Sequence, residues 1–255
     1  PAEIAEAKQL IAELHALSAV VTRTRKVEVE EGAALRVAEA VAVEMTDTEA
    51  ALYNAIYQWQ LDRAEARNMP VGFIGQMPLR LAGSCLPAAR DSVLGQYRSP
   101  SGEFLDPHEH DIELDNDSVP PPEVVKAARA LGETDTKFDA FVERLRSSIA
   151  QGHKVLIFSF FLPTIDYLER RLSSEFRITS ITGKVDTEER GDLMRRFRGG
   201  EFDVLLASRV ASEGLDFEFC GAVVNYDLPW NPMEVEQRIG RIDRFGQENE
   251  IGRAH

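Results

Sequence analysis

The chain has 255 residues, of which 44% are hydrophobic and 28% charged, and its formal net charge is −14. This composition is typical of a soluble globular protein with one large or two small domains, and no apolar run approaches the ~20 residues of a membrane-spanning helix. The acidity argues against a protein that coats nucleic acid over its whole surface, but it is compatible with a local basic groove.

The first 68 residues predict a helical segment that contains one strand-like stretch. Residues 1–20 carry apolar side chains at helical spacing together with several glutamates, so they indicate an amphipathic helix and no signal peptide. Residues 37–43 hold three valines in a pattern that favours a strand. Thr46, followed by Glu49 three residues later, is the pattern of a capping box, so a helix is expected to begin there.

Residues 69–133 are rich in Gly, Pro and Ser and then in acidic residues, which predicts an irregular acidic connector, disordered in part. His108 and His110 stand beside carboxylates in this stretch. Two histidines at a spacing of two in an acidic loop are more often solvated than metal-bound, so no metal site is expected. Cys85 and Cys220 lie far apart and form no ligand or disulfide pattern, which favours a reduced, cytoplasmic protein.

From residue 134 to residue 255 apolar strands alternate with amphipathic helices. Strands are predicted at 154–161, 176–182, 202–208 and 221–229, and helices at 136–152, 163–174, 186–200 and 231–246. This alternation predicts an α/β domain with a parallel sheet that helices cover on both faces. Ligands of such sheets bind at the carboxyl ends of the strands, so the residues that follow strands are the candidates: Gly183, 208–216 and 227–231.

The segment "LLASRVASEGLDF" contains two residues that suit a nucleotide. Gly214 permits an unusual backbone conformation or a close approach to a ligand, and Asp216 can accept hydrogen bonds from ribose hydroxyls or hold a nearby arginine. The same residue types are also expected in an ordinary turn between a strand and a helix. The segment "ITGKVDT" does not have the glycine spacing of a phosphate-binding loop.

Two further segments have both a functional and a structural interpretation. Trp230 in "DLPWNP" could stack on a base, or it could be a core side chain beneath a turn. In "QRIGRIDRFGQ", Arg238, Arg241 and Arg244 recur every three residues near one helix face, and their guanidinium groups suit a phosphate. Alternatively, they form a solvated face that pairs with neighbouring carboxylates.

The order and spacing of these segments resemble the second RecA-like lobe of superfamily two helicases. The matching segments are "KVLIFSFF", "ITGKVDTEERGDLMRRF", "VLLASRVASEGLDF", "VVNYDLPWNP" and "EQRIGRIDRFGQ". The "WNP" and "RFGQ" elements are similar to the SWI/SNF class of double-stranded DNA translocases, and "SEGLDFEF" with the segment after it looks most like the bacterial RapA-like branch. "VVTRTRKVEVE" resembles the junction between the two lobes, whereas residues 69–133 match poorly.

The resemblance implies roles for individual residues. Arg241 and Arg244 would reach the ATP phosphates across a cleft between two lobes, and Gln237 is a further fixed position of that catalytic motif. The nucleotide-binding positions would be Gly214, Asp216 and Gly240, and the positions that face double-stranded DNA would be Ser208, Trp230 and Gly183. The family's Walker A loop and Asp-Glu motif are not in this sequence, so ATP and Mg²⁺ would be held mainly by an N-terminal RecA-like lobe of the same protein, with no membrane involved.

The resemblance therefore predicts half of an ATP-driven motor that hydrolyses no ATP by itself. The family usually adds another sheet strand after "FGQENEI", and residues 252–255 are read as a remnant in its place. One alternative is a helicase that separates strands of RNA or DNA, against which "WNP" weighs. A second is a non-catalytic binding module, against which the intact Gln237, Arg241 and Arg244 weigh.

Overall fold

The structure is a computed structural model that describes residues 36–39, 41–68, 77–96, 119–208, 215, 217–228 and 251–254. Only the backbone is described for residues 36–39 and 251–254. The helices predicted at 1–20 and 231–246 lie outside these ranges. Within them, no helix combines the length and the apolar character that crossing a membrane requires.

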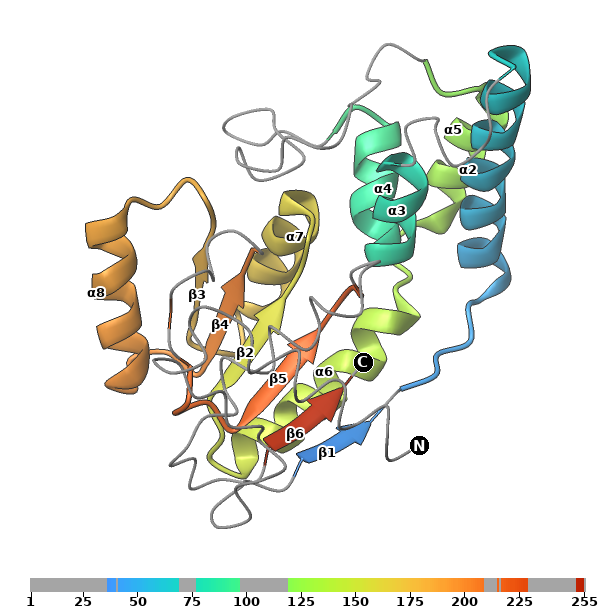
Figure 1. Cartoon of the computed structure of the whole chain (residues 1–255). Helices are drawn as coiled ribbons and strands as arrows, with labels where there is room; N and C mark the ends of the chain where they lie inside the picture. The colour runs from blue at the N-terminus through green and yellow to red at the C-terminus, as the bar shows by residue number, and fades with distance from the viewer. Residues whose placement is uncertain are drawn as a thin grey trace, which may run out of the picture. The chain divides into compact units, whose positions relative to one another are not determined.

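A six-stranded parallel sheet forms the centre of the described structure, with the strand order β1-β6-β5-β2-β4-β3 (Figure 1). The strands are β1 (Arg36–Glu39), β2 (Val155–Phe158), β3 (Ile178–Ile181), β4 (Val204–Ala207), β5 (Ala222–Asn225) and β6 (Ile251–Ala254). The predicted α/β fold with a parallel sheet is confirmed. Residues 252–254 of β6 pair with β5 and β1, and the interpretation of 252–255 as a remnant stays a prediction.

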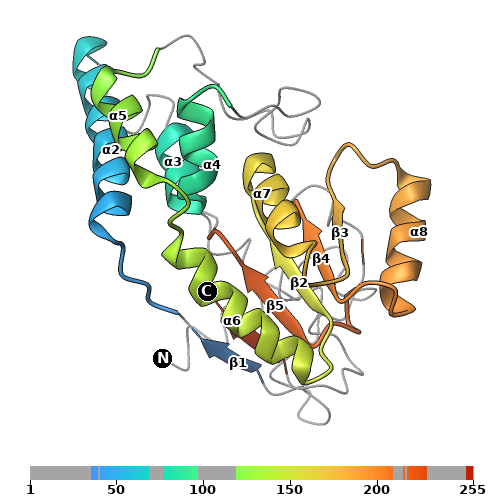
Figure 2. The same cartoon turned by 180° about the vertical axis from the view of Figure 1, so that it is seen from behind.

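Strand β2 explains why the sheet has helices on both faces. Its side chains alternate between two hydrophobic clusters: Val155 and Ile157 lie on one face, and Leu156 and Phe158 on the other. All four are fully buried, as expected for a central strand of a parallel sheet. Helices α6 (Thr136–Ala150) and α7 (Leu162–Leu172) cover the first face, in front of the sheet in Figure 2. Helix α8 (Thr187–Arg198) contributes to the second cluster through Phe197.

The starts of these helices follow the signals in the sequence. Asp186 caps α8 by accepting a hydrogen bond from the Glu189 amide, and Gly199 follows the last residue of the helix, which was predicted at 186–200. Helix α7 carries Pro163 in its first turn, where a missing amide proton has no cost. Asp135 caps α6 through the Phe138 amide at 2.9 Å, and its other oxygen accepts from the Tyr167 hydroxyl at 2.7 Å. That carboxylate therefore also joins α6 to α7.

Four more helices form a second part of the structure, here named the helical block: α2 (Asp47–Ala66), α3 (Met77–Ser84), α4 (Leu86–Val93) and α5 (Pro122–Leu131). Three of them lie within 69–133, where the sequence predicts an irregular connector. The prolines that suggest loops stand in the first turns of helices: Pro78 in α3, Pro87 in α4 and Pro122 in α5. The helices are short, so their apolar stripes are also weak sequence signals.

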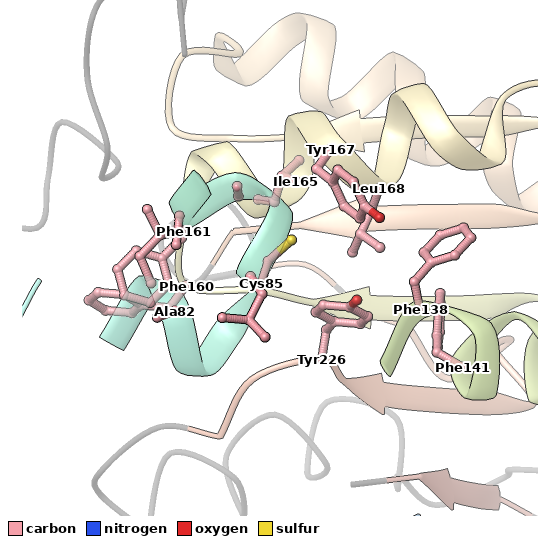
Figure 3. Close-up of a cluster of buried hydrophobic side chains, with 14 of the residues drawn as sticks. Ala82, Cys85, Phe138, Phe141, Phe160, Phe161, Ile165, Tyr167, Leu168 and Tyr226 are labelled. Carbon is pink, nitrogen blue, oxygen red and sulfur yellow. The ribbon is translucent and has the colours of Figure 1, made fainter. Parts of the chain in front are cut away.

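The helical block and the sheet share one hydrophobic core. Figure 3 shows Ala82 of α3 and Cys85 beside Phe160 and Phe161, which follow β2, and near Tyr226, which follows β5. All of these side chains belong to a single cluster of buried residues that also includes Phe138 of α6 and Ile165 of α7. Cys85 and Cys220 are both buried and free, and burial raises the pKa of each thiol, so neither is a reactive thiolate.

Glu49 joins the start of α2 to the start of α6. It completes the predicted capping box with Thr46, whose amide donates to Glu49 Oε2 at 2.8 Å. The amide of Thr136, the first residue of α6, donates to Glu49 Oε1, also at 2.8 Å, and its hydroxyl is 3.0 Å from both oxygens. One buried carboxylate thus satisfies amide groups at two helix N-termini, which is also where the helix dipole favours negative charge.

We predict that Glu49→Gln lowers the free energy of unfolding of the chain by about 1–3 kcal/mol at pH 7, because the amide cannot accept from all four donors. Burial alone would raise the pKa of Glu49, but hydrogen bonds from the Thr136 and Thr46 backbones and hydroxyls outweigh burial and lower it. The stabilisation is therefore complete above the ordinary value of 4.5 and is lost as the pH falls through the lowered pKa.

Chemical denaturation of both proteins from pH 7 to acid pH measures this effect. The stability difference between them should be largest above pH 4.5 and shrink below it. Glu65→Gln is the matched control, because Glu65 is an exposed residue of the same helix. A Glu49→Gln protein as stable as the control at pH 7 would contradict the assignment of Glu49 as a cap of both α2 and α6.

Candidate functional site

The carboxyl ends of β2, β3, β4 and β5 lie along one edge of the sheet. Their last residues are paired in register: Phe158 with Ala207 and with Asn225, and Ile181 with Ala207. The residues that follow each strand therefore emerge side by side. This edge is where parallel α/β sheets bind ligands, so it is the candidate site of the described structure.

Two of the residues predicted to face nucleic acid, Gly183 and Ser208, are brought to this edge from neighbouring strands. The Ser208 amide donates to the Ile181 carbonyl at 3.1 Å, which continues the ladder between β4 and β3. Gly183 lies in the turn after β3, where the Val185 amide donates to the Thr182 carbonyl, and it is half-buried beside the exposed Lys184. Ser208 is only 1% exposed, so its hydroxyl is not part of the accessible surface of this edge.

Asp227, two residues after β5, is the most extensively hydrogen-bonded carboxylate at this edge among the described residues. Its Oδ2 accepts from the Ser159 hydroxyl at 2.6 Å, and both oxygens accept from the Phe160 amide, at 2.9 and 3.1 Å. Ser159 and Phe160 directly follow β2, so Asp227 ties the ends of two adjacent strands together. The segment 227–231 stands out in the sequence as residues after a strand, but the pattern assigns no partner to Asp227.

The other predicted site residues all lie outside the described ranges. They are Gly214, Asp216, Trp230, Gln237, Gly240, Arg241 and Arg244, and the same holds for Arg238, His108 and His110. The described neighbour Phe217 is fully buried and packs edge-on against Phe158 of β2, with ring centroids 6.5 Å apart. Leu215 packs against the same hydrophobic cluster, so the described residues on both sides of position 216 belong to the core of the second face.

The described part of the edge offers hydroxyl, amide and carboxylate groups. In these ranges no three His, Cys, Asp or Glu side chains gather in a way that could hold a metal ion. The geometry thus places two of the expected nucleic-acid positions together. It also identifies one carboxylate, Asp227, that accepts hydrogen bonds from other residues of the chain.

The sequence of residues 136–246 matches the family described as the helicase conserved C-terminal domain. The uncharacterized ATP-dependent helicase YqhH of Bacillus subtilis is 43% identical over 104 residues, which are 38% of this chain and 18% of that protein. The DEAD-box ATP-dependent RNA helicase 14 of Arabidopsis thaliana is 38% identical over 105 residues, which are 41% of this chain and 17% of that protein. The chain thus matches less than a fifth of the length of either relative.

Two solved structures have a similar fold over nearly the whole chain. The C-terminal part of the Fun30 ATPase domain has a TM-score of 0.59 at 16% identity and covers 87% of this chain and 84% of that one. The Hef helicase domain of Pyrococcus furiosus has a TM-score of 0.59 at 17% identity and covers 90% of this chain and 57% of that one. At such identities the likeness concerns the fold. Together with the family match, it supports a RecA-like helicase C-terminal fold for residues 136–246.

Proposed function

We propose that this chain is the C-terminal motor lobe of an ATP-dependent double-stranded DNA translocase of the SWI/SNF class, closest to its RapA-like branch. The observation that carries the proposal is the ordered set of motifs in the sequence, which lies within the helicase C-terminal match of residues 136–246. The phosphate-binding loop and the Mg²⁺ ligands belong, in this proposal, to a preceding lobe of the same, longer protein.

The proposed chemistry of this lobe is charge stabilisation by arginine. A transferring phosphoryl group spreads negative charge over its oxygens, and guanidinium groups that arrive when two lobes close can stabilise that charge. Arg241 and Arg244 are proposed for this role, with Gln237 and Gly240 as further positions of the same motif. Gly214 and Asp216 are proposed to lie near the nucleotide.

Double-stranded DNA is proposed as the track because of the segment "YDLPWNP". Gly183 and Trp230 are the preferred contacts. Ser208 is the weaker candidate, because its side chain is buried. A strand-separating helicase is the second candidate, and the 38% identity to an RNA helicase over 105 residues favours it. A non-catalytic binding module is a third, which the intact arginines disfavour.

The first prediction is that the isolated 255-residue chain hydrolyses no ATP, because no phosphate-binding loop is present in its sequence. Phosphate release with and without double-stranded DNA is the measurement, and the full-length protein that carries the chain is the positive control. DNA-stimulated release by the chain alone would contradict the division of labour between two lobes.

The second prediction concerns the arginines of residues 237–247. Arg241→Lys and Arg244→Lys should each reduce DNA-stimulated turnover of the full-length protein by ~10³–10⁵, because a lysine lacks the planar fork. Arg238→Lys is the matched control and should be mild. The directions of Arg238 and Arg244 on a helix differ by about 120°, so the three arginines cannot all address one phosphate, and the resemblance assigns that role to Arg241 and Arg244. Nucleotide binding should persist in all three. Near-normal turnover of Arg244→Lys would favour the solvated-face interpretation.

The third prediction separates translocation from strand separation. The full-length protein should displace the third strand of a DNA triplex but should not separate a plain duplex of RNA or DNA. Trp230→Ala should slow triplex displacement more than ATP turnover without DNA, since aromatic contacts with nucleic acid contribute about 1–3 kcal/mol. Equal loss of both activities would favour a core tryptophan, and separation of a plain duplex would favour the second candidate.

A further inference from the structure

Asp227 has a third partner, and it comes from the helical block. The hydroxyl of Ser84, the last residue of α3, donates to Asp227 Oδ2 at 2.7 Å, although 143 positions separate the two residues in the sequence. Ser84 is 1% exposed, so the donor side of this hydrogen bond is buried. One carboxylate oxygen therefore binds donors from the helical block and from the end of β2 together, since Ser159 donates to the same atom.

The hydrogen bond between Ser84 and Thr164 has a defined direction. Their hydroxyl oxygens are 2.9 Å apart, and Thr164 is fully buried in the first turns of α7. Ser84 has a single hydroxyl proton, which it donates to the carboxylate, so Thr164 must be the donor to Ser84. The polar chain thus runs from Thr164 through Ser84 to Asp227.

Lys137 of α6 fixes the same end of α3 from another side. Its Nζ donates to the Ser84 carbonyl at 2.6 Å and to the Gly83 carbonyl at 3.4 Å, two of the carbonyl groups that a helix C-terminus leaves without internal partners. The ammonium group lies 4.4 Å from the centroid of the Tyr226 ring. Burial lowers the pKa of Lys137, while the charge of Asp227 acts in the opposite direction, so the two charges stabilise each other.

The position of Asp227 in the chain gives this cluster a consequence beyond packing. Tyr226 is buried, whereas Leu228 is 57% exposed, so the backbone leaves the core at Asp227. Asp227 is thus the last hydrogen-bonded anchor that is described before the chain continues toward Trp230. If α3 shifts, Ser84 pulls on the same carboxylate oxygen that the end of β2 holds, and the backbone at residue 227 moves with it.

We propose that Asp227 is a positioning residue through which the helical block sets the carboxyl end of β5, and with it the start of the segment proposed to contact nucleic acid. This inference rests on the proposed function. Asp227 takes no part in the chemistry itself. Through Asp227, the affinity for nucleic acid depends on the position of α3. Ser84 is the side chain that links α3 to this carboxylate.

The test uses Ser84→Ala in the full-length protein that carries this chain. Ser84→Ala removes one donor from Asp227 and leaves Ser159 and the Phe160 amide in place. Thr164→Val is the matched control, because it removes one buried hydrogen bond of the same cluster without touching Asp227. Ser159→Ala is a second variant, which removes a donor to the same oxygen from β2.

ATP turnover is measured against the concentration of linear double-stranded DNA. Ser84→Ala and Ser159→Ala should raise the DNA concentration for half-maximal stimulation by about tenfold, with turnover at saturating DNA within about twofold of the unaltered protein. Thr164→Val should change neither quantity by more than about twofold. Amide hydrogen exchange across residues 222–228 should be faster in Ser84→Ala than in Thr164→Val, whatever the activity.

Two results would overturn the inference. One is a Ser84→Ala protein whose DNA dependence and amide exchange match those of Thr164→Val. The other is equal loss of DNA affinity and saturated turnover in Ser84→Ala and Thr164→Val, which would make the cluster a general stabilising contact. If the unaltered protein shows no DNA-stimulated turnover, the proposed function fails and this inference falls with it. If the unaltered protein does show DNA-stimulated turnover, the variants test this inference separately from the proposed function.

Discussion

Burial of both faces of β2 is the constraint on which the rest of the described structure depends. A parallel strand donates and accepts along both edges, and its side chains alternate between two faces, so Val155 and Ile157 need one apolar layer and Leu156 and Phe158 need another. Helices α6 and α7 supply the first layer, and α8 contributes to the second. Because each link between strands then passes through a crossover, all carboxyl ends emerge at one edge. The parallel arrangement of the strands therefore determines where the candidate site lies.

Carboxylates organise the ends of the elements around that core. Asp186 caps one helix, Asp135 caps another and binds Tyr167, and Glu49 satisfies amides at two helix starts. Asp227 performs the corresponding task at the end of a strand. These acidic side chains accept hydrogen bonds from backbone amides. At a helix N-terminus this is favourable, because the amides there lack partners within the helix and the helix dipole stabilises a negative charge. The chain's net charge of −14 thus includes groups that hold the fold together, and it is a poor guide to the charge of its ligands.

The helical block is a structural partner of the RecA-like domain and shares its core. The cluster in Figure 3 takes side chains from α3, α6, α7 and the end of β5, and the polar chain from Thr164 to Asp227 runs beside it. A buried apolar contact is tolerant of small displacements, whereas short hydrogen bonds to one carboxylate are directional. In the inferred arrangement, a shift of the block would therefore act on the backbone at Asp227 in particular.

The local elements of residues 134–228 followed from the sequence alone. Strand burial, the Asp186 cap, the proline in the first turn of α7 and the capping box of Thr46 and Glu49 are signals carried within a few neighbouring residues, and local hydrogen bonding realises them directly. The order of the motifs in the sequence also predicted the helicase C-terminal fold, because that order specifies the strands and the edge at which they end. The roles of Arg241, Arg244 and Trp230 remain predictions from the sequence.

The tertiary structure decided what depends on distant residues. Helices α3, α4 and α5 are short and carry prolines in their first turns, so only their burial in the shared hydrophobic core distinguishes them from loops. The sequence indicated the capping box that Glu49 forms at the start of α2. The hydrogen bond from the Thr136 amide to Glu49 requires the starts of α2 and α6 to lie close together in space. Ser84 and Asp227 are 143 positions apart, and no pattern in either segment indicates the other. A hydrogen bond depends on distance and direction in space, and a linear sequence specifies these only for residues that are close along the chain.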